Sequence, residues 1–376
     1  MLEELRPQLI DSDDGVSEVA QACASIGRIA LDTEADSLHS YFHKVCLIQI
    51  SADDTHFIID PLALDPDRLN PLWTAVADPS VAVVMHGADY DLRVLDRDYG
   101  TRVTGLEDTQ IMAQLLGEPK TGLGALLELE FELELDKKHQ RADWGRRPLS
   151  PELLAYAAAD TAHLIPLAHR LRSRLEEVGR WPWAEEEFRK LEQVRYNAPA
   201  QDPLAFERVK GARSLAGAAR DRMYDLFQWR DREAQRRDLP PFKVLGNRPM
   251  LELALDPPQD MEEMTRVSGL GARFVRRWGR AVLRQLQKPR SAPPRRSAPR
   301  DPQPPATVRR RMKRLSEVRD EVAAELNLQP GLVCPKATVL EIAAAGDSRA
   351  ALEAAGLTGW RLEVLGDRFV EALEEA

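Results

Sequence analysis

The sequence predicts an α/β domain built on a central β-sheet, followed by two small all-α domains. Three observations lead to this fold class. Short apolar runs alternate with helical patterns in the first part of the chain, the pattern is entirely helical from Pro151 onward, and the chain beyond residue 212 repeats itself. Strands that alternate with helices are typical of α/β domains, and an internal repeat indicates two copies of one module.

Four apolar runs enriched in Val and Ile have the length and composition of strands. Two further segments, residues 69–78 and 106–117, have the spacing of amphipathic helices. The four predicted strands are residues 27–34, 44–51, 55–60 and 81–87.

Local signals mark the ends of two of the predicted helices. Gly117, followed by Pro119, indicates the end of the helix over residues 106–117. Ser150 is expected to cap a helix that has Pro151 at its first position and Glu152 in its first turn.

The repeat defines the second half of the chain. Shifted by 89 positions, residues 230–254 align without a gap on residues 319–343. The predicted domains are residues 1–212 (α/β with trailing helices), 213–288 and 309–376 (the two helical copies). A Pro- and Arg-rich linker over residues 289–308 separates the copies. Among the recurring residues, Arg230, Asp231, Pro241 and Leu251 return as Arg319, Asp320, Pro330 and Leu340.

Charge is distributed unevenly along the chain. The net charge of −9 divides into −16 for residues 1–212, +14 for residues 213–315 and −7 for residues 316–376. A basic block can neutralise phosphates of a nucleic acid, and an acidic region suits divalent cations. The alternative is that these stretches are solvated faces with no partner.

Composition excludes several classes of protein. The chain has no apolar run long enough to span a bilayer, and its first residues carry acid where a secretory signal carries base. Its three cysteines, Cys23, Cys46 and Cys334, are odd in number and form no CxxC pair. We therefore expect a cytoplasmic protein with reduced, buried cysteines and no membrane contact.

Acidic residues follow predicted strands and one predicted helix. Asp32 and Glu34 are two apart at the end of a strand, so their side chains share one face of the sheet. Asp91 follows the strand over residues 81–87, and Asp160 lies one helical turn after Tyr156. If these carboxylates converge, only a cation makes their repulsion tolerable, and all-oxygen ligands suit Mg²⁺ or Mn²⁺. Taken singly, each has a structural alternative: a solvated strand edge, a charge at a helix N-terminus, or an ordinary helix face.

The motifs together resemble the ribonuclease D family, whose members are DEDD exonucleases of the subtype with tyrosine in the last motif. The resemblance is carried by LDTEADSLHSYFHKVCLIQIS, HGADYDLRVL, DTQIMAQLL and RADWGRRPLSPELLAYAAADTAHLIPLA, and the repeated helical modules look like HRDC domains. It covers nearly the whole chain and implies a ribonuclease H-like, mixed sheet flanked by helices. Ala35 departs from the family, because many members carry an aromatic residue after Asp-x-Glu.

The resemblance also implies site residues and a mechanism. Asp32 would bridge two Mg²⁺ or Mn²⁺ ions, Glu34 and Asp160 would complete the first, and Asp91 would hold the second. One ion would activate a water and the other would stabilise the leaving 3′ oxygen. Tyr156 would orient the water, because a phenol with an ordinary pKa of about 10 is a poor base. The implied reaction releases 5′-mononucleotides from RNA 3′ ends.

Further residues are candidates for contact with the substrate. His86 precedes Asp91 and is either a phosphate contact or structural. Arg141, Trp144 and Arg147 precede the helix of Asp160. They could grip a phosphate and stack on a base, or Trp144 could bury against the sheet while the arginines pair with acids. In the first helical copy, Arg276, Arg277 and Arg280 lie in a basic stripe at helical spacing that could follow an RNA backbone.

The function expected from the sequence is 3′–5′ exoribonuclease activity on the 3′ ends of structured RNA such as transfer RNA precursors, with no obligatory protein partner. A DNA 3′–5′ exonuclease is the alternative within the same enzyme class, because no residue identified here recognises a 2′-hydroxyl. A catalytically silent RNA-binding scaffold is the alternative from another class. It would require a missing carboxylate, and Asp32, Glu34, Asp91 and Asp160 are all present.

Overall fold

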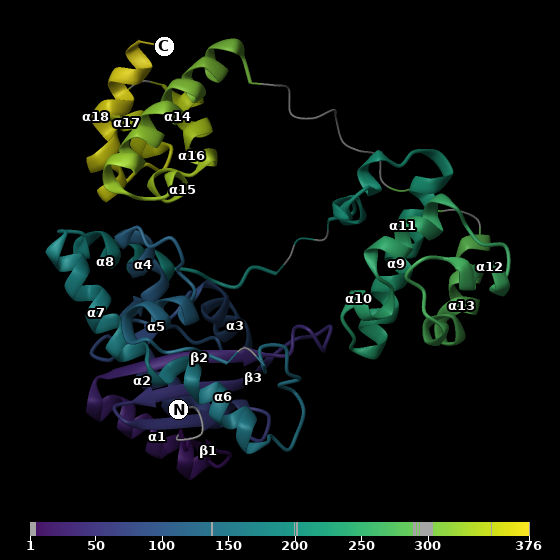
Figure 1. Cartoon of the computed structure of the whole chain (residues 1–376), viewed down its shortest axis with the longest axis horizontal. Helices are drawn as coiled ribbons and strands as arrows, with labels where there is room; N and C mark the ends of the chain where they lie inside the picture. The colour runs from purple at the N-terminus through teal and green to yellow at the C-terminus, as the bar shows by residue number, and fades with distance from the viewer. Residues whose placement is uncertain are drawn as a thin grey trace. The chain divides into compact units, whose positions relative to one another are not determined.

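The computed structural model describes residues 5–136, 138–198, 200, 202–288, 291, 293, 304–346 and 348–375. The chain forms two compact units (Figure 1). Unit 1 comprises residues 1–35, 45–197 and 302–376, and unit 2 comprises residues 36–44 and 198–301. The α/β domain and the second helical module therefore belong to one unit, and the first helical module to the other.

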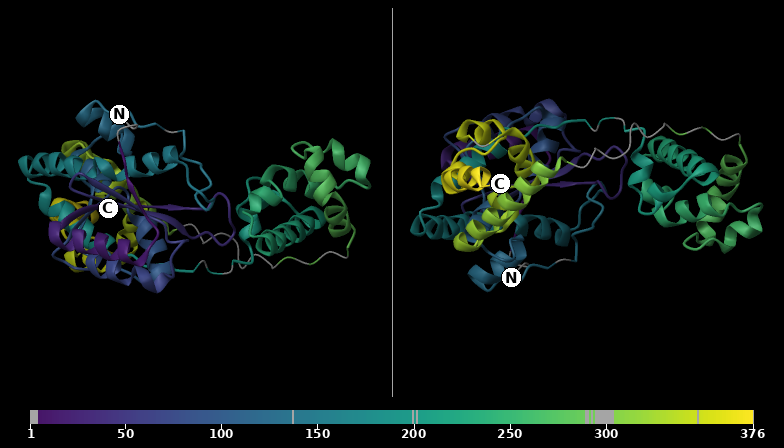
Figure 2. Two further views of the ribbon diagram at one scale, coloured as in Figure 1. Left: turned by 90° about the horizontal axis from the view of Figure 1, so that it is seen from below. Right: turned by 90° about the horizontal axis from the view of Figure 1, so that it is seen from above.

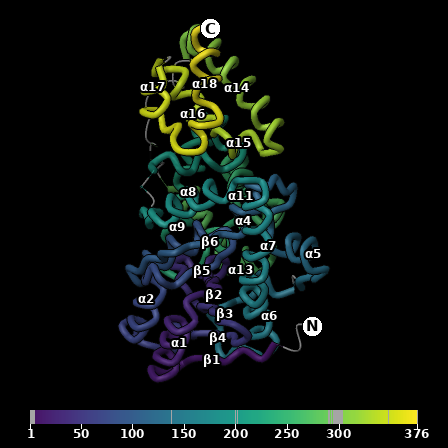
Figure 3. The backbone as a smooth tube through the Cα atoms, turned by 90° about the vertical axis from the view of Figure 1, so that its left-hand side faces the viewer, coloured from purple at the N-terminus to yellow at the C-terminus, as the bar shows by residue number. Residues whose placement is uncertain are grey.

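Unit 1 contains a six-stranded mixed sheet in the order β1-β4-β3-β2-β5-β6. β3 runs antiparallel to β2 and β4, whereas the other neighbouring pairs are parallel. Figure 3 shows the strands stacked in this order. The mixed sheet that the family resemblance implied is confirmed. The strands are β1 (Gln8–Ile10), β2 (Arg28–Ala35), β3 (Val45–Ala52), β4 (Thr55–Ile59), β5 (Ala82–Met85) and β6 (Leu106–Asp108).

The predicted strands correspond to β2–β5, but the two edge strands were not predicted. β1 and β6 have three residues each, too few for a periodic pattern. The helix predicted over residues 106–117 is wrong for its first three residues, which form β6. Helix α4 (Thr109–Leu116) begins after Asp108, whose carboxylate accepts hydrogen bonds from the amides of Gln110 and Ile111 at 2.8 and 3.1 Å.

Helices cover both faces of the sheet (Figure 3). On one face, α1 and α2 pack over the buried side chains of β2–β5 in a single apolar core. On the other face, α6 packs on β2, β3 and β4, and Ser150 and Pro151 begin it as predicted. The helices of this domain are α1 (Asp13–Ile26), the short 3₁₀ helix η2 (Pro66–Leu69), α2 (Asn70–Val76), α3 (Asp89–Tyr99), α4, α5 (Leu123–Phe131), α6 (Pro151–Ala162), α7 (Leu164–Glu177) and α8 (Trp181–Leu191).

The second helical module shares an apolar core with the α/β domain. Side chains of α4, α7 and α8 and of the module's helices form one continuous buried cluster. The indole rings of Trp183 and Trp360 stack at 4.6 Å with 12° between their planes. The module consists of α14 (Ala306–Leu326), α15 (Pro330–Val333), α16 (Lys336–Ala345), α17 (Arg349–Ala354) and α18 (Trp360–Glu374).

Charged contacts reinforce this packing. The Arg361 guanidinium donates to both oxygens of Glu187 at 2.5 and 3.0 Å, and the Trp360 indole donates to the same carboxylate at 3.1 Å. Arg180 donates to two main-chain carbonyls, that of Leu115 in α4 at 2.8 Å and that of Leu326 in α14 at 2.7 Å. The second copy thus has a structural role within unit 1.

Unit 2 is a helical bundle (Figure 2), and its buried apolar side chains form a core of their own. Residues 36–44, which connect β2 to β3, belong to it. The amides of Tyr41 and Phe42 both donate to Asp238 at 2.9 Å, and the Tyr41 hydroxyl donates to Asp231 at 2.8 Å. The helices of unit 2 are η3 (Ala205–Arg208), η4 (Ala212–Ser214), α9 (Gly217–Arg237), α10 (Pro241–Val244), α11 (Asn247–Leu255), α12 (Met261–Arg266) and α13 (Ala272–Gln287).

Most of the predicted linker over residues 289–308 lies outside the described residues. Helix α14 begins at Ala306, inside the predicted linker, because Pro305 is the last proline of that linker and the residues that follow favour a helix. Cys23, Cys46 and Cys334 are buried, and none of the three forms a disulfide bond, as predicted. Among the described helices, none combines the length and the apolar character needed to cross a bilayer.

The shared core of unit 1 leads to a stability prediction. Trp360 is 1% exposed. Trp360→Ala should lower the free energy of unfolding by about 3–5 kcal/mol, because it removes a large buried ring and leaves a cavity. Urea denaturation measures the change. The control is Leu340→Ala, because Leu340 is 38% exposed in the same module and its loss should change stability by about 0.5 kcal/mol or less. Equal stability of the two variants would contradict the shared core.

Candidate active site

The Asp32-x-Glu34 pair lies at the end of the central strand β2. Side chains alternate along a strand, so Asp32 and Glu34 point to the same face. Ala30 of β2 shares this face with Asp32 and lies directly opposite Ser51 of β3. Because the Ser51 hydroxyl lies 2.7 Å from the Thr161 hydroxyl of α6, this is the face that α6 covers. The two carboxylates therefore lie beneath α6.

Helix α6 brings Tyr156 and Asp160 to the same place. The two residues are one helical turn apart. Together with Asp32 and His86 they line a pocket of about 460 Å³. The pocket is completed by Gly122, Leu123, Gly124, Ala125, Leu135, Asp136, Gln140 and Ala159.

Asp91 lies in the first turn of α3, close behind β5, and is buried. Its carboxylate accepts a hydrogen bond from the Thr33 hydroxyl, which links α3 to the residue between Asp32 and Glu34. Burial raises the pKa of Asp91 to about 6, although the hydrogen bond from Thr33 acts in the opposite direction.

A buried carboxylate fixes the turn that leads to Asp91. Asp108 is 0% exposed and accepts hydrogen bonds from the amides of Gly87 at 3.1 Å and Ala88 at 2.8 Å, in addition to those from α4. Next to it, the Thr109 hydroxyl lies 2.9 Å from Nδ1 of His86. Asp108 therefore holds the turn that carries His86 and leads to Asp91.

Burial and mutual repulsion disfavour ionisation of the carboxylates. Burial, and then the charges of Asp91, Asp160 and Glu34, raise the pKa of Asp32 well above its usual range. Burial, and then Asp160 and Asp91, raise the pKa of Glu34 to about 8. Burial raises the pKa of Asp160 to about 7. A bound cation would stabilise the ionised form of these neighbouring acidic groups.

The donor set has the chemistry of a site for a hard divalent cation. All four carboxylates offer oxygen ligands, which Mg²⁺ and Mn²⁺ prefer. Across the part of the chain that the structure describes, no group of three or more His, Cys, Asp or Glu side chains is already arranged to hold an ion.

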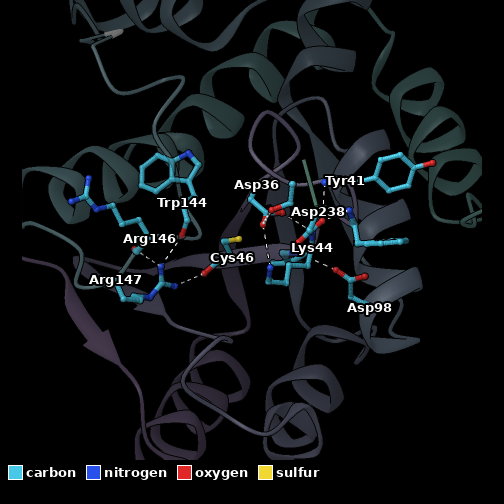
Figure 4. Close-up of polar contacts among 12 residues, drawn as sticks. Asp36, Tyr41, Lys44, Cys46, Asp98, Trp144, Arg146, Arg147 and Asp238 are labelled. Atoms are coloured by element: carbon cyan, nitrogen blue, oxygen red, sulfur yellow. Dashed lines mark hydrogen bonds and ion pairs between the residues drawn. The ribbon is translucent and has the colours of Figure 1, made fainter. Parts of the chain in front are cut away.

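Trp144 and Arg147, which precede α6, make their contacts within the domain. Trp144 is 2% exposed in an apolar cluster with residues of β3, β4 and α6. Arg147 donates to both oxygens of Asp60 at 2.5 and 2.6 Å. It also donates to the carbonyls of Cys46 and Trp144 at 2.9 and 2.7 Å (Figure 4). These contacts favour packing over substrate binding for Trp144 and Arg147.

The remaining candidates lie in different places. His86 lines the pocket, and burial lowers its pKa, so it is neutral at pH 7. Arg141 is exposed in the loop before α6. Arg276, Arg277 and Arg280 are exposed on α13 in unit 2.

Two residues of the site were missed by the sequence analysis. Asp108 lies in a DTQ segment whose cap signal, an Asp directly before a helical pattern, was available. Thr33 gave no signal of its own, because its partner Asp91 is distant in the sequence.

Comparisons with known proteins agree with this geometry. The family model described as a 3′-5′ exonuclease matches residues 7–176, and the HRDC domain model matches residues 219–286 and 308–373. The fold and the site thus define a 3′–5′ exonuclease followed by two HRDC domains.

Relatives identify the family more closely. Ribonuclease D of Granulibacter bethesdensis is 30% identical over 378 residues, which cover 96% of this chain and 91% of the relative. The chain belongs to the ribonuclease D family, and it is a 3′–5′ exoribonuclease; metal dependence is general in this family.

Solved structures agree with this assignment. The crystal structure of Escherichia coli RNase D is 26% identical, with a TM-score of 0.67 and coverage of 99% of both chains. The catalytic core of RRP6 from Trypanosoma brucei is 27% identical, with a TM-score of 0.68, and the match covers 76% of this chain and 80% of that one.

The raised pKa of Glu34 predicts how stability depends on pH. Between about pH 4.5 and 8, the folded state binds a proton at Glu34 that the unfolded state has lost. Stability of the metal-free protein should therefore fall as pH rises through this window. Glu34→Gln should raise the melting temperature at pH 8, by about 2–4 °C for each kcal/mol of repulsion removed, and have little effect at pH 4.5. Melting curves in EDTA at both pH values measure this. An equal change in melting temperature at the two pH values would contradict the raised pKa of Glu34.

Proposed function

We propose that this pocket hydrolyses the 3′-terminal phosphodiester of RNA with two Mg²⁺ or Mn²⁺ ions, releasing 5′-mononucleotides. Asp32, Glu34, Asp91 and Asp160 would hold the ions. The observation that carries the proposal is the cluster of carboxylates around Asp32. Burial raises the pKa of all four, and neighbouring acids raise the pKa of Asp32, Glu34 and Asp91 further. When bound, the ions would supply the positive charge that activates a water and stabilises the leaving 3′ oxygen.

Tyr156 would orient the attacking water as a hydrogen-bond donor. Burial, and then the charges of Asp160 and Glu34, raise the pKa of its phenol further above 10, so the hydroxyl keeps its proton at neutral pH. The ring is held by Trp144, stacked at 6.1 Å, and by His139, edge-on at 5.6 Å. A fixed, protonated phenol supports a role in orientation and not in proton abstraction.

The size of the pocket supports cleavage at a chain end. A volume of about 460 Å³ lies within the range of about 300–1,000 Å³ typical of small-ligand pockets, so it suits one terminal nucleotide. His86, neutral and beside Asp32, could donate a hydrogen bond to that nucleotide without adding charge.

We propose structured RNA, including transfer RNA precursors, as the substrate class. The solved Escherichia coli relative is described as an exoribonuclease involved in structured RNA processing. The first HRDC domain supports the assignment, because Arg276, Arg277 and Arg280 are exposed on one helix and could contact RNA phosphates. The second HRDC domain packs into unit 1 and has a net charge of only −2 over residues 309–376, so we assign it no RNA contact.

We expect hydrolysis of RNA to depend completely on a divalent metal ion and on Asp160. Asp160→Asn should lower kcat at least about 10³-fold, because transition-state charge is stabilised through this ligand. Addition of EDTA to the unaltered protein should abolish activity. Release of mononucleotides from matched RNA and DNA oligomers with free 3′ ends measures both effects and tests the DNA alternative.

The control for this experiment is Asp65→Asn, because Asp65 is exposed and its side chain caps no helix. It should retain full activity. Undiminished hydrolysis by the purified Asp160→Asn protein would refute the proposed site, and faster hydrolysis of DNA than RNA would favour the alternative substrate.

The exposed arginines of α13 predict a change in salt dependence. Replacing Arg276, Arg277 and Arg280 together by Gln should weaken RNA binding and reduce the slope of log K against log salt by about 2, since each phosphate contact to a single strand contributes about 0.7. Affinity measured at several salt concentrations tests this.

Arg248 and Arg266 provide the matched control. Both are exposed in the same HRDC domain, but each is paired with a glutamate of its own helix at 3.2 and 2.5 Å. Replacing them by Gln should change the slope less. If both sets changed the slope equally, the proposed role of the α13 stripe would be wrong.

A further inference from the structure

Gln49, in the middle of β3, is a buried polar residue without a partner. Its side chain is 0% exposed, and neither its Oε1 nor its Nε2 has a hydrogen-bond partner among the described residues. An amide buried in this way destabilises a protein, and most buried polar groups are therefore paired. Such an exception calls for a physical reason.

The position of Gln49 supplies that reason. In the antiparallel pairing of β2 with β3, Gln49 lies directly opposite Asp32. Residues directly opposite each other project to the same face, with Cβ atoms about 4.5–5.5 Å apart. The amide therefore lies beneath α6, beside one of the carboxylates that would hold the ions.

Three further residues next to Gln49 on this face do not pair with its amide. Leu47 precedes it in β3 and Ile58 lies opposite it in β4; both are apolar and 0% exposed. Ser51 follows it in β3, and its hydroxyl lies 2.7 Å from the Thr161 hydroxyl and 2.8 Å from Nδ1 of His56. A methionine or leucine would fill the same space without burying an unpaired donor and acceptor. Packing alone therefore does not account for glutamine at this position.

We infer that Gln49 is a positioning residue for Asp32. When a divalent ion is bound, the Nε2 group of Gln49 donates a hydrogen bond to the Asp32 carboxylate and fixes the orientation in which its oxygens meet the metal. Hydrogen bonds of this kind orient metal-ligating carboxylates, and their loss typically weakens metal affinity about 10–100-fold. This inference rests on the proposed function, because it requires Asp32 to be a metal ligand.

The test is Gln49→Met, which keeps the length and approximate volume of the side chain and removes both polar atoms. The metal-free variant should melt at the same temperature as the unaltered chain or about 2–4 °C higher, because an unpaired buried amide is removed. Its affinity for Mn²⁺, measured by calorimetric titration without RNA, should fall about 10–100-fold.

Leu47→Met is the matched control, because Leu47 lies on the same strand and face, is equally buried and has no polar atom. It should leave the Mn²⁺ affinity unchanged. A lower melting temperature of the metal-free Gln49→Met protein would mark a structural role and overturn the inference, and so would an unchanged Mn²⁺ affinity. If the unaltered chain bound no Mn²⁺, the proposed function would fail, and this inference with it.

Discussion

Repulsion between buried acidic groups is the constraint on which the site depends. β2 carries Asp32 and Glu34 into the centre of the sheet, and α6 places Asp160 over them. Burial and proximity raise the pKa of these groups so far that, without a cation, some of them remain protonated at neutral pH. The fold therefore holds together carboxylates that would separate if free, and a pair of divalent ions would stabilise the arrangement.

Contacts outside the pocket hold this unfavourable arrangement in place. Asp108 ties the turn before Asp91 to the start of α4, and the Thr33 hydroxyl ties Asp91 to β2. Arg147 joins the loop before α6 to β3 and to Asp60. The second HRDC domain extends the core behind α4, α7 and α8. The strain of gathering like charges is thus opposed by contacts that need no ion.

The sequence predicted the features that arise from local periodicity. Apolar runs predicted β2–β5 because these strands are buried, and Ser150 with Pro151 predicted the start of α6 because a helix cap is a local interaction. The order of the motifs Asp-x-Glu, Asp and Tyr-x-x-x-Asp indicated the site residues. The structure brings three of these residues, Asp32, Tyr156 and Asp160, into one pocket.

The surroundings of Trp144 and Arg147 were not predictable from the sequence, because Asp60 and the β3 carbonyls become neighbours of this loop only after folding. The same reason hid Thr33 and Gln49, whose partners or neighbours come from other elements. The packing of the second HRDC domain on α8 depends on Glu187 and Trp183, which look like ordinary helix residues until the shared core forms.

If the carboxylates around Asp32 hold divalent ions, they must give up protons when the ions bind. Calorimetric titration of the metal-free protein with Mn²⁺ at pH 7, in two buffers of different ionisation enthalpy, measures the protons released on binding. Because burial raises the pKa of Glu34 to about 8 and that of Asp160 to about 7, we expect saturable binding with net proton release that diminishes above pH 8. Absence of binding, or binding whose heat is the same in both buffers, would contradict it.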